Sequence, residues 1–205
     1  MKCSLTTTGY APVIAATALC LGACRGGPDF EVGPGLQPEL GVEVQGYPAG
    51  IISGLRFEWP NEGPSMWSAR VAYNASDRQD WAEHDDETGG GIGLGVGWRY
   101  WKDAELHNPG EQGAHYRGWH FGGRVDFWAL EIDWQDFSPS LQSGRSDVLV
   151  AQPTLEAGYS WQTLKGHRID LTFGVGAEIN IDTDGEDVGE GAIALIGLSF
   201  MPSAR

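Results

Sequence analysis

Basic residues, catalytic motifs and helical patterning are scarce in this sequence, and each shortage excludes a class of protein. The formal net charge of the 205 residues is −15, and no three basic residues stand in a row. Nucleic-acid binding by counterion release needs a basic face, so a nucleic-acid partner is excluded. The sequence also has no His-x-Ser signature, no Gly-x-Ser-x-Gly elbow and no His-Glu-x-x-His pair. We therefore expect neither an enzyme nor a bound cofactor.

No segment carries apolar residues at convincing helical spacing, and the apolar run over 10–23 is too short for a membrane-spanning helix. What the sequence has in excess is glycine, with 31 residues, and tryptophan, with 9. Glycine permits close approach of neighbouring backbones, and tryptophan suits positions with one apolar and one wet side. This composition favours a pleated structure.

The first residues predict export from the cytoplasm. Lys2 precedes the apolar run, which ends in Leu21-Gly22-Ala23-Cys24, and this ending resembles the lipobox of bacterial lipoproteins. The resemblance implies a signal peptide over 1–23 and acylation of Cys24. No cysteine follows Cys24, and lipidation would account for a lone thiol in an oxidising compartment. Arg25 in place of an aspartate implies sorting to the outer membrane. An ordinary secretory leader with a chance cysteine is the alternative.

After a Gly- and Pro-rich tether over 24–37, the sequence alternates apolar and polar residues, which predicts β-strands. The connections at 48–50, 61–64 and 163–166 are tight, so neighbouring strands are antiparallel. The fold class expected is all-β, an antiparallel up-and-down β-barrel of about eight strands over 38–201, with a tail at 202–205. The expected strands contain residues 40–44, 55–59, 67–73, 92–100, 119–134, 147–161, 168–182 and 191–201, with long polar connections at 76–89, 102–117 and 135–146.

Within the fifth segment the parity of the apolar residues changes. Val125 and Phe127 lie on one face, and Trp128, Leu130 and Ile132 then fall on the other. No turn residue stands at this point, so we predict a β-bulge there rather than a new hairpin.

Three features favour an outer-membrane barrel with its apolar face turned to lipid over a soluble barrel. The expected strands are about 10 residues or longer, the length that crosses a bilayer at a tilt. The polar face is rich in glycine and carries charges of both signs but little lysine, which suits a crowded lumen. Aromatic residues stand near strand ends, as in an interfacial girdle: Trp59, Trp67, Trp98, Tyr100, Trp119, Trp134, Tyr159, Trp161 and Phe200.

On this pattern the segment 38–201 resembles the small eight-stranded outer-membrane barrels, the OmpA-like and OmpW-like class. The resemblance implies a Gram-negative outer-membrane location, lipid as the surrounding partner, and a structural or surface-interaction role with loop partners unknown. Pro153 inside a strand and the residues that follow Phe200 depart from the pattern. The alternative is a lipid-anchored periplasmic barrel that binds a small apolar ligand, as lipocalins do.

The polar face supplies the candidate site. In a lumen barely wider than its own side chains, buried charges must pair, and we expect His120 to be hydrogen-bonded among them rather than catalytic. The predicted ion-pair network comprises Glu43, Arg56, Glu58, Arg70, Arg99, Arg124, Asp126, Arg168, Asp170 and Glu178, with Glu39 and Glu156 on the same face.

No metal site is expected. Asp182, Asp184 and Asp187 form a weak calcium candidate, since clustered oxygen ligands suit that ion. An acidic turn around Gly185 explains the same residues.

Overall fold

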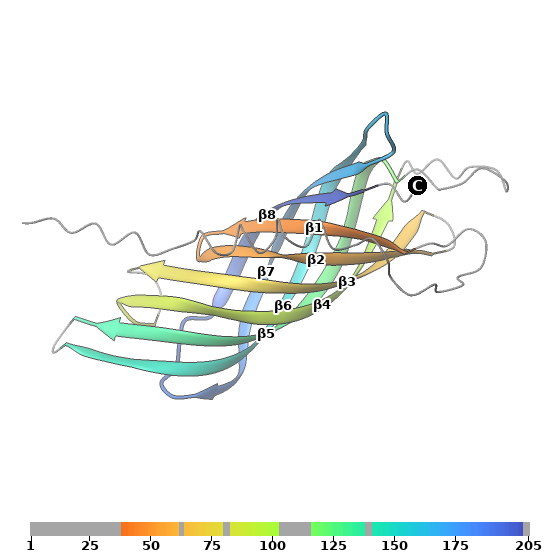
Figure 1. The fold of residues 1–205 in the computed structure, drawn as a ribbon. Helices are drawn as coiled ribbons and strands as arrows, with labels where there is room; N and C mark the ends of the chain where they lie inside the picture. The colour runs from red at the N-terminus through yellow and green to blue at the C-terminus, as the bar shows by residue number, and fades with distance from the viewer. Residues whose placement is uncertain (1–37, 62–63, 80–82, 103–115, 138–140, 203–205) are drawn as a thin grey trace, which may run out of the picture. The chain divides into compact units, whose positions relative to one another are not determined.

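The computed structural model describes residues 38–61, 64–79, 83–102, 116–137 and 141–202. Its eight strands are all antiparallel and close into one barrel in sequence order, with β8 hydrogen-bonded to β1 (Figure 1). The expected all-β, up-and-down barrel is confirmed. No helix long and apolar enough to span a membrane occurs among the described residues. The strands are β1 (Glu39–Tyr47), β2 (Gly50–Pro60), β3 (Ser65–Gln79), β4 (Asp86–Trp101), β5 (Gly118–Asp136), β6 (Gln142–Gln162), β7 (Arg168–Asp184) and β8 (Gly191–Met201).

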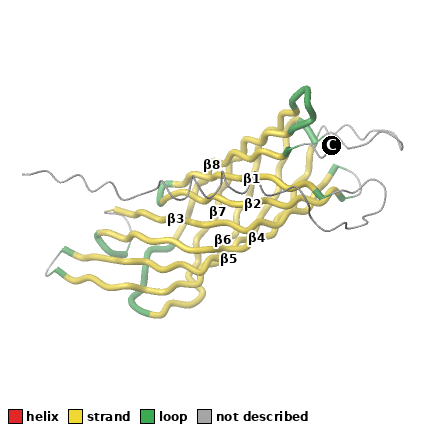
Figure 2. The backbone as a smooth tube through the Cα atoms, in the orientation of Figure 1, coloured by secondary structure: helices red, strands yellow, loops and turns green. Residues whose placement is uncertain are grey.

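The strands are longer, and two connections shorter, than the sequence predicts. β3 and β4 leave only 80–85 between them, and β5 and β6 leave 137–141 (Figure 2), so the long connections expected at 76–89 and 135–146 are wrong. The residues assigned to these loops belong to strands that continue beyond the apolar part of the wall. Their polar side chains lie on both faces, since Arg78 and Glu87 are buried inside and Arg145 is exposed outside. The longest connection joins Trp101 to Gly118, as expected.

The predicted bulge in β5 is also wrong. The register of β5 with β4 and with β6 runs without a shift past Phe127 and Trp128. The apolar residues change sides instead: Phe127 is 48 % exposed on the outside, whereas Trp128 and Ile132 are buried inside. The parity change therefore marks an exchange of the apolar face from the exterior to the interior of the barrel.

A register shift does occur between β6 and β7. Their register shifts between Leu149 and Val150, because β7 carries Ile181 as an extra residue. Pro153 lies further along β6, opposite Val125 of β5. On the other side of β6, Pro153 is not paired with a residue of β7. The barrel therefore accommodates the proline at a place where one ladder is interrupted.

The strands divide the barrel into two zones. We call the end where β1 begins and β8 ends the terminal end, and the opposite end the distal end. β3 to β7 continue distally past the β1–β2 hairpin, as the yellow to blue strands of Figure 1 do past the orange ones. We call this continuation the extension; it consists of residues 76–79, 86–90, 130–136, 142–149 and 180–184.

Candidate functional site

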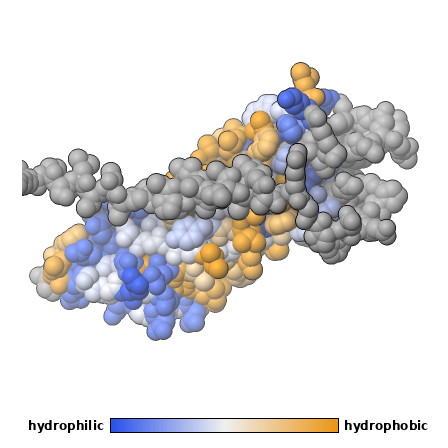
Figure 3. Space-filling view, viewed as in Figure 1, coloured by the Kyte–Doolittle hydropathy of each residue, from blue (hydrophilic) through white to orange (hydrophobic). Residues whose placement is uncertain are grey.

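The exterior nearer the terminal end is an uninterrupted apolar surface, which we call the belt. Its residues alternate with lumen residues along every strand, and Ile92, Leu94 and Leu155 are each more than 60 % exposed. In Figure 3 the apolar surface gathers on the middle of the barrel and the hydrophilic surface toward the lower left, over the extension. Soluble monomers rarely expose contiguous apolar patches above a few hundred Å². The belt includes Val44, Ile51, Val71, Tyr73, Ile92, Leu94, Val96, Val125, Phe127, Leu155, Phe173, Val175, Ile179, Ile196 and Leu198.

Aromatic side chains border the belt at the terminal end. The register places most of them opposite one another from strand to strand along the wall from β2 to β8, with Ile169 between Trp161 and Phe200. The exposed fractions of Trp67 and Trp119 are 54 % and 60 %. Aromatic girdles of this kind occupy the membrane–water interface in transmembrane barrels. The register pairs are Trp59–Trp67, Trp67–Trp98, Tyr100–Phe121, Trp119–Tyr159, Trp161–Ile169 and Ile169–Phe200.

Glycine on the inner face makes room for the charged side chains. A Cβ atom on Gly95 would lie 1.8 Å from Oδ1 of Asp126, and one on Gly158 would lie 2.6 Å from Cε1 of His120. Both distances are far below any real contact, so a larger residue at either position of β4 or β6 would displace Asp126 or His120.

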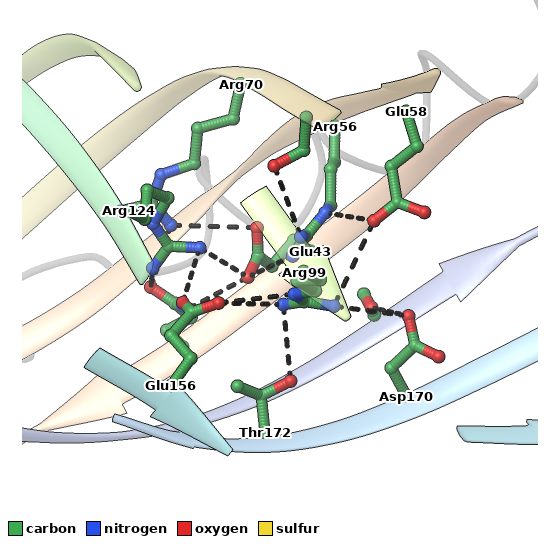
Figure 4. Close-up of polar contacts among 12 residues, drawn as sticks. Glu43, Arg56, Glu58, Arg70, Arg99, Arg124, Glu156, Asp170 and Thr172 are labelled. Atoms are coloured by element: carbon green, nitrogen blue, oxygen red, sulfur yellow. Dashed lines mark hydrogen bonds and ion pairs between the residues drawn. The ribbon is translucent and has the colours of Figure 1, made fainter. Parts of the chain in front are cut away.

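The centre of the lumen holds Glu43 among three arginines (Figure 4). Its Oε1 lies 3.2 Å from Arg56 Nη1 and 3.2 Å from Arg124 Nη1, and its Oε2 lies 3.7 Å from Arg70 Nη1. Gln45 also donates from Nε2 to Glu43 at 2.8 Å and accepts from Arg70 and Arg124 at Oε1. The carboxylate of Glu43 and the amide of Gln45, both on β1, thus link arginine side chains from β2, β3 and β5.

Arg124 pairs with three carboxylates, those of Glu43, Asp126 and Glu156. It donates from Nε to Asp126 at 2.9 Å, and its Nη1 lies 2.9 Å from Glu156 Oε1. Asp126 also accepts from Arg70 Nε at 2.7 Å, and Glu156 from Arg99 Nη2 at 3.1 Å. All of these side chains are at most 4 % exposed. Pairing of this density is what makes buried charge tolerable.

The network continues to the terminal end through Arg168. This guanidinium donates to Glu58 and, at 3.0 Å, to Glu39, and its Nε lies 3.2 Å from Asp170. Arg99 connects the two halves, since its Nη1 lies 3.6 Å from Asp170 Oδ2.

The structure brings together every predicted network residue except Glu178. Glu178 lies farther toward the distal end and binds Arg78 Nη2 at 2.6 Å, and Arg78 Nη1 lies 3.2 Å from Glu87. Sequence reasoning missed Gln45, Arg78 and Glu87 as parts of the interior. Gln45 stood on the predicted polar face without a charge, whereas the other two fell in the segment assigned to a loop.

His120 contradicts the expectation that it is hydrogen-bonded. It is buried on the inner face of β5, and neither ring nitrogen has a hydrogen-bond partner in the described structure. Its ring packs 5.2 Å from that of Trp101, which donates from Nε1 to Ser160 at 3.0 Å. His120 is therefore held by packing beneath an aromatic cover that also includes Tyr116.

Distal to the network around Glu43 and Arg168 the lumen becomes mostly apolar, although it also holds Arg78 with Glu87 and Glu178. Trp128 separates the two regions: Arg70 lies 5.2 Å from its ring centroid, and Nε1 donates to Gln152 at 3.0 Å. Beyond it Leu130, Ile132 and other buried side chains form the core of the extension. Buried side chains therefore occupy the interior both at the level of the belt and in the extension.

The remaining candidates add no second site. No three His, Cys, Asp or Glu side chains in the described part of the chain come together as metal ligands would, and Asp182, Asp184 and Asp187 are among those residues. Cys24, the predicted signal peptide over 1–23 and the tether over 24–37 lie outside the described residues.

Comparison with known proteins found no matching family model and no matching curated protein. Among solved structures the barrel is similar to Neisserial surface protein A, with a TM-score of 0.41 and 8 % sequence identity over 79 % of this chain and 94 % of that one. It is also similar to the beta domain of the Bordetella autotransporter BrkA, with a TM-score of 0.28 and 9 % identity over 83 % of this chain and all of that one. The fold class stands on the strand order and register of the chain itself.

Proposed function

We propose that this chain is an integral β-barrel of a bacterial outer membrane with a sealed lumen and a structural or surface-interaction role. The observation that carries the proposal is the exchange of faces along the strands. In the belt zone apolar side chains point outward and charges inward, whereas Leu130 and Ile132 of the extension point inward and Glu131 and Asp133 outward. Only a medium that changes from lipid to water along the barrel stabilises both arrangements.

The height of the belt fits a bilayer. On β5 the outward face is apolar from Trp119 to Ala129. The ten rises between these two residues, at about 3.3 Å each and tilted by about 40°, span roughly 25 Å, the height of the apolar band of outer-membrane barrels. The girdle then lies at one interface, and the first outward charges of the extension lie beyond the other.

The ligand-binding alternative is less well supported. A barrel that carries an apolar ligand needs an apolar interior, whereas this lumen holds Glu43, Arg124 and their partners at the level of the belt. Such a barrel would also expose the belt to water at about 25 cal/mol for each Å². The same paired side chains occupy the lumen at this level, so we infer neither a diffusion pore nor catalysis.

Lipidation belongs to the same proposal. The lipobox-like Leu21-Gly22-Ala23-Cys24 supports acylation of Cys24, which would attach the N-terminus to the membrane that the barrel spans. Acylation of Cys24 and insertion of the barrel can be tested separately, because loss of Cys24 leaves the barrel wall unchanged.

Cysteine accessibility tests the membrane assignment. In a Cys24→Ser background, single cysteines replace Val175 in the belt and Asp133 on the extension, and intact outer membranes are treated with a water-soluble maleimide. We expect rapid labelling at 133, and labelling at 175 only after denaturation. Equal labelling of the two positions in folded protein would refute the proposal. Heat-dependent gel mobility confirms that both variants are folded.

A further inference from the structure

The wall of the extension has a notch on one side. β8 pairs with β7 only as far as Gly191 opposite Glu178, whereas β7 continues to Asp184 along β6. The β1–β2 hairpin ends at about the same level, so the extension is an open sheet of five strands, β3 to β7. Among the described residues, 180–184 make no strand pairing on the side away from β6.

The connection between β7 and β8, residues 185–190, lies across this notch and is fixed there. Val188 is buried in the apolar core. Arg78 donates to the carbonyl oxygen of Gly189, and Gly189 N donates to Glu87 Oε1 at 2.9 Å. Nε2 of His84 lies 2.9 Å from the carbonyl oxygen of Asp187. These contacts come from β3, β4 and the turn between them. They hold the segment across the notch, but the segment does not occupy all of it.

A cavity of about 790 Å³ remains beside the edge of β7. It is lined by residues 180–183 of that edge, by 187–193 and by the turn from Tyr47 to Ala49. This volume lies within the range of about 300–1,000 Å³ found for ligand pockets. An extended segment along 180–184 would span roughly 16 Å at about 3.3 Å per residue.

At this edge a side-chain carboxylate already takes the place of a neighbouring strand. Asn180 N donates to the carboxylate Oε2 of Glu190 at 2.8 Å. In a continuous sheet a backbone carbonyl would accept that hydrogen bond. The backbone N–H of Asn180 on the β7 edge therefore points toward the cavity and finds its hydrogen-bond acceptor on that side. Strand addition requires an edge with backbone donors oriented in this way.

The charge of the lining selects the occupant. Arg78 is the one cation among the described lining residues, and Glu87 and Glu178 already pair with it. The lining carboxylates are Glu83, Glu178, Asp182, Asp187 and Glu190. A second copy of this chain, with its net charge of −15, would be repelled.

We propose that the β7 edge is a docking site for an extended basic peptide, which adds as a strand to 180–184 and takes the place of the Glu190 carboxylate. Backbone pairing supplies the binding geometry, and the carboxylates around the cavity select cationic side chains. The site lies in the extension, so the proposal does not depend on membrane insertion.

Fluorescence anisotropy of the full-length protein in detergent tests this site. The probe is a labelled hexapeptide of alternating lysine and valine, and the matched control peptide carries N-methyl groups on alternate residues of the same sequence. We expect saturable binding of the probe only, together with slowed amide hydrogen exchange at 181–184. Equal binding of the N-methylated peptide, or of a glutamate–valine peptide, would overturn the proposal.

Variants separate the site from general attraction to an acidic protein. Asp182→Asn and Asp187→Asn should each weaken binding about two- to fivefold, as expected for one exposed ion pair. Asp147→Asn removes an exposed carboxylate outside the cavity and should leave binding unchanged. If Asp147→Asn weakens binding as much as Asp182→Asn does, the docking site is wrong. Heat-dependent gel mobility verifies the fold of each variant.

Discussion

Removal of Arg124 should destabilise the barrel more than removal of any exposed arginine. Arg124 lies 3.2, 2.9 and 2.9 Å from Glu43, Asp126 and Glu156, all buried. In Arg124→Ala these carboxylates keep only their other arginine partners, and the lumen gains one uncompensated negative charge. Breaking a buried pair by removing one partner costs about 3–5 kcal/mol, so we expect a loss of this size in the free energy of unfolding.

The assay is equilibrium unfolding by urea in lipid vesicles, followed by tryptophan fluorescence. Arg145→Ala is the matched control, because Arg145 pairs with Asp133 and Glu131 on the exterior of the extension, where all three side chains are more than half exposed. Exposed pairs of this kind contribute little, so the control should unfold with the wild type. If both variants lose the same stability, the lumen charges are not buried as ion pairs and the sealed lumen is refuted.

Four further predictions test the belt, the lumen and the anchor. Val175→Arg should cost about 2–4 kcal/mol of unfolding free energy in vesicles, because it places a charge in the belt, while Ser143→Arg on the extension should not change stability. Gly95→Ala should cost about 1–3 kcal/mol by crowding Asp126, whereas Gly123→Ala, whose Cβ would lie 3.4 Å from its nearest neighbour, should be tolerated. Planar bilayers should show no steady, porin-sized current, and such a current would contradict a filled lumen. A palmitate analogue should label wild-type protein and not Cys24→Ala, and equal labelling of both would exclude acylation there.

The fold class could be predicted because an alternation of period two specifies strands, and tight antiparallel connections specify a meander. The same alternation placed Val175 and Arg124 on opposite faces, as they are in the structure. A change of parity has two physical causes, a bulge or an exchange of the apolar face. The register with neighbouring strands decides between them, and that register is not contained in the local sequence around Phe127 and Trp128.

The extent of the ion-pair network was harder to predict for a geometric reason. Barrel strands tilt by about 35–45°, so residues on the same polar face of two strands lie at different heights. Glu178 shares the inward parity of Asp170 on β7 but lies in the apolar zone of the lumen, next to Arg78. His84 and Glu87 fell in a segment without alternation, and their contacts with 187–189 depend on a chain crossing that no local pattern indicates.

For the membrane-inserted barrel proposed above, the exchange of faces would also determine the depth of the barrel in the bilayer. Movement toward the terminal end would draw Glu131, Asp133 and Arg145, all on the exterior, into hydrocarbon, and charges there cost up to about 2–4 kcal/mol each at the midplane. Movement the other way would expose apolar belt residues to water and carry the girdle away from its interface. Both displacements would raise the free energy, so the proposal implies one preferred depth, with the extension in water. In the proposed membrane setting, the β7 edge and its cavity would remain accessible to a soluble peptide while the belt contacts lipid.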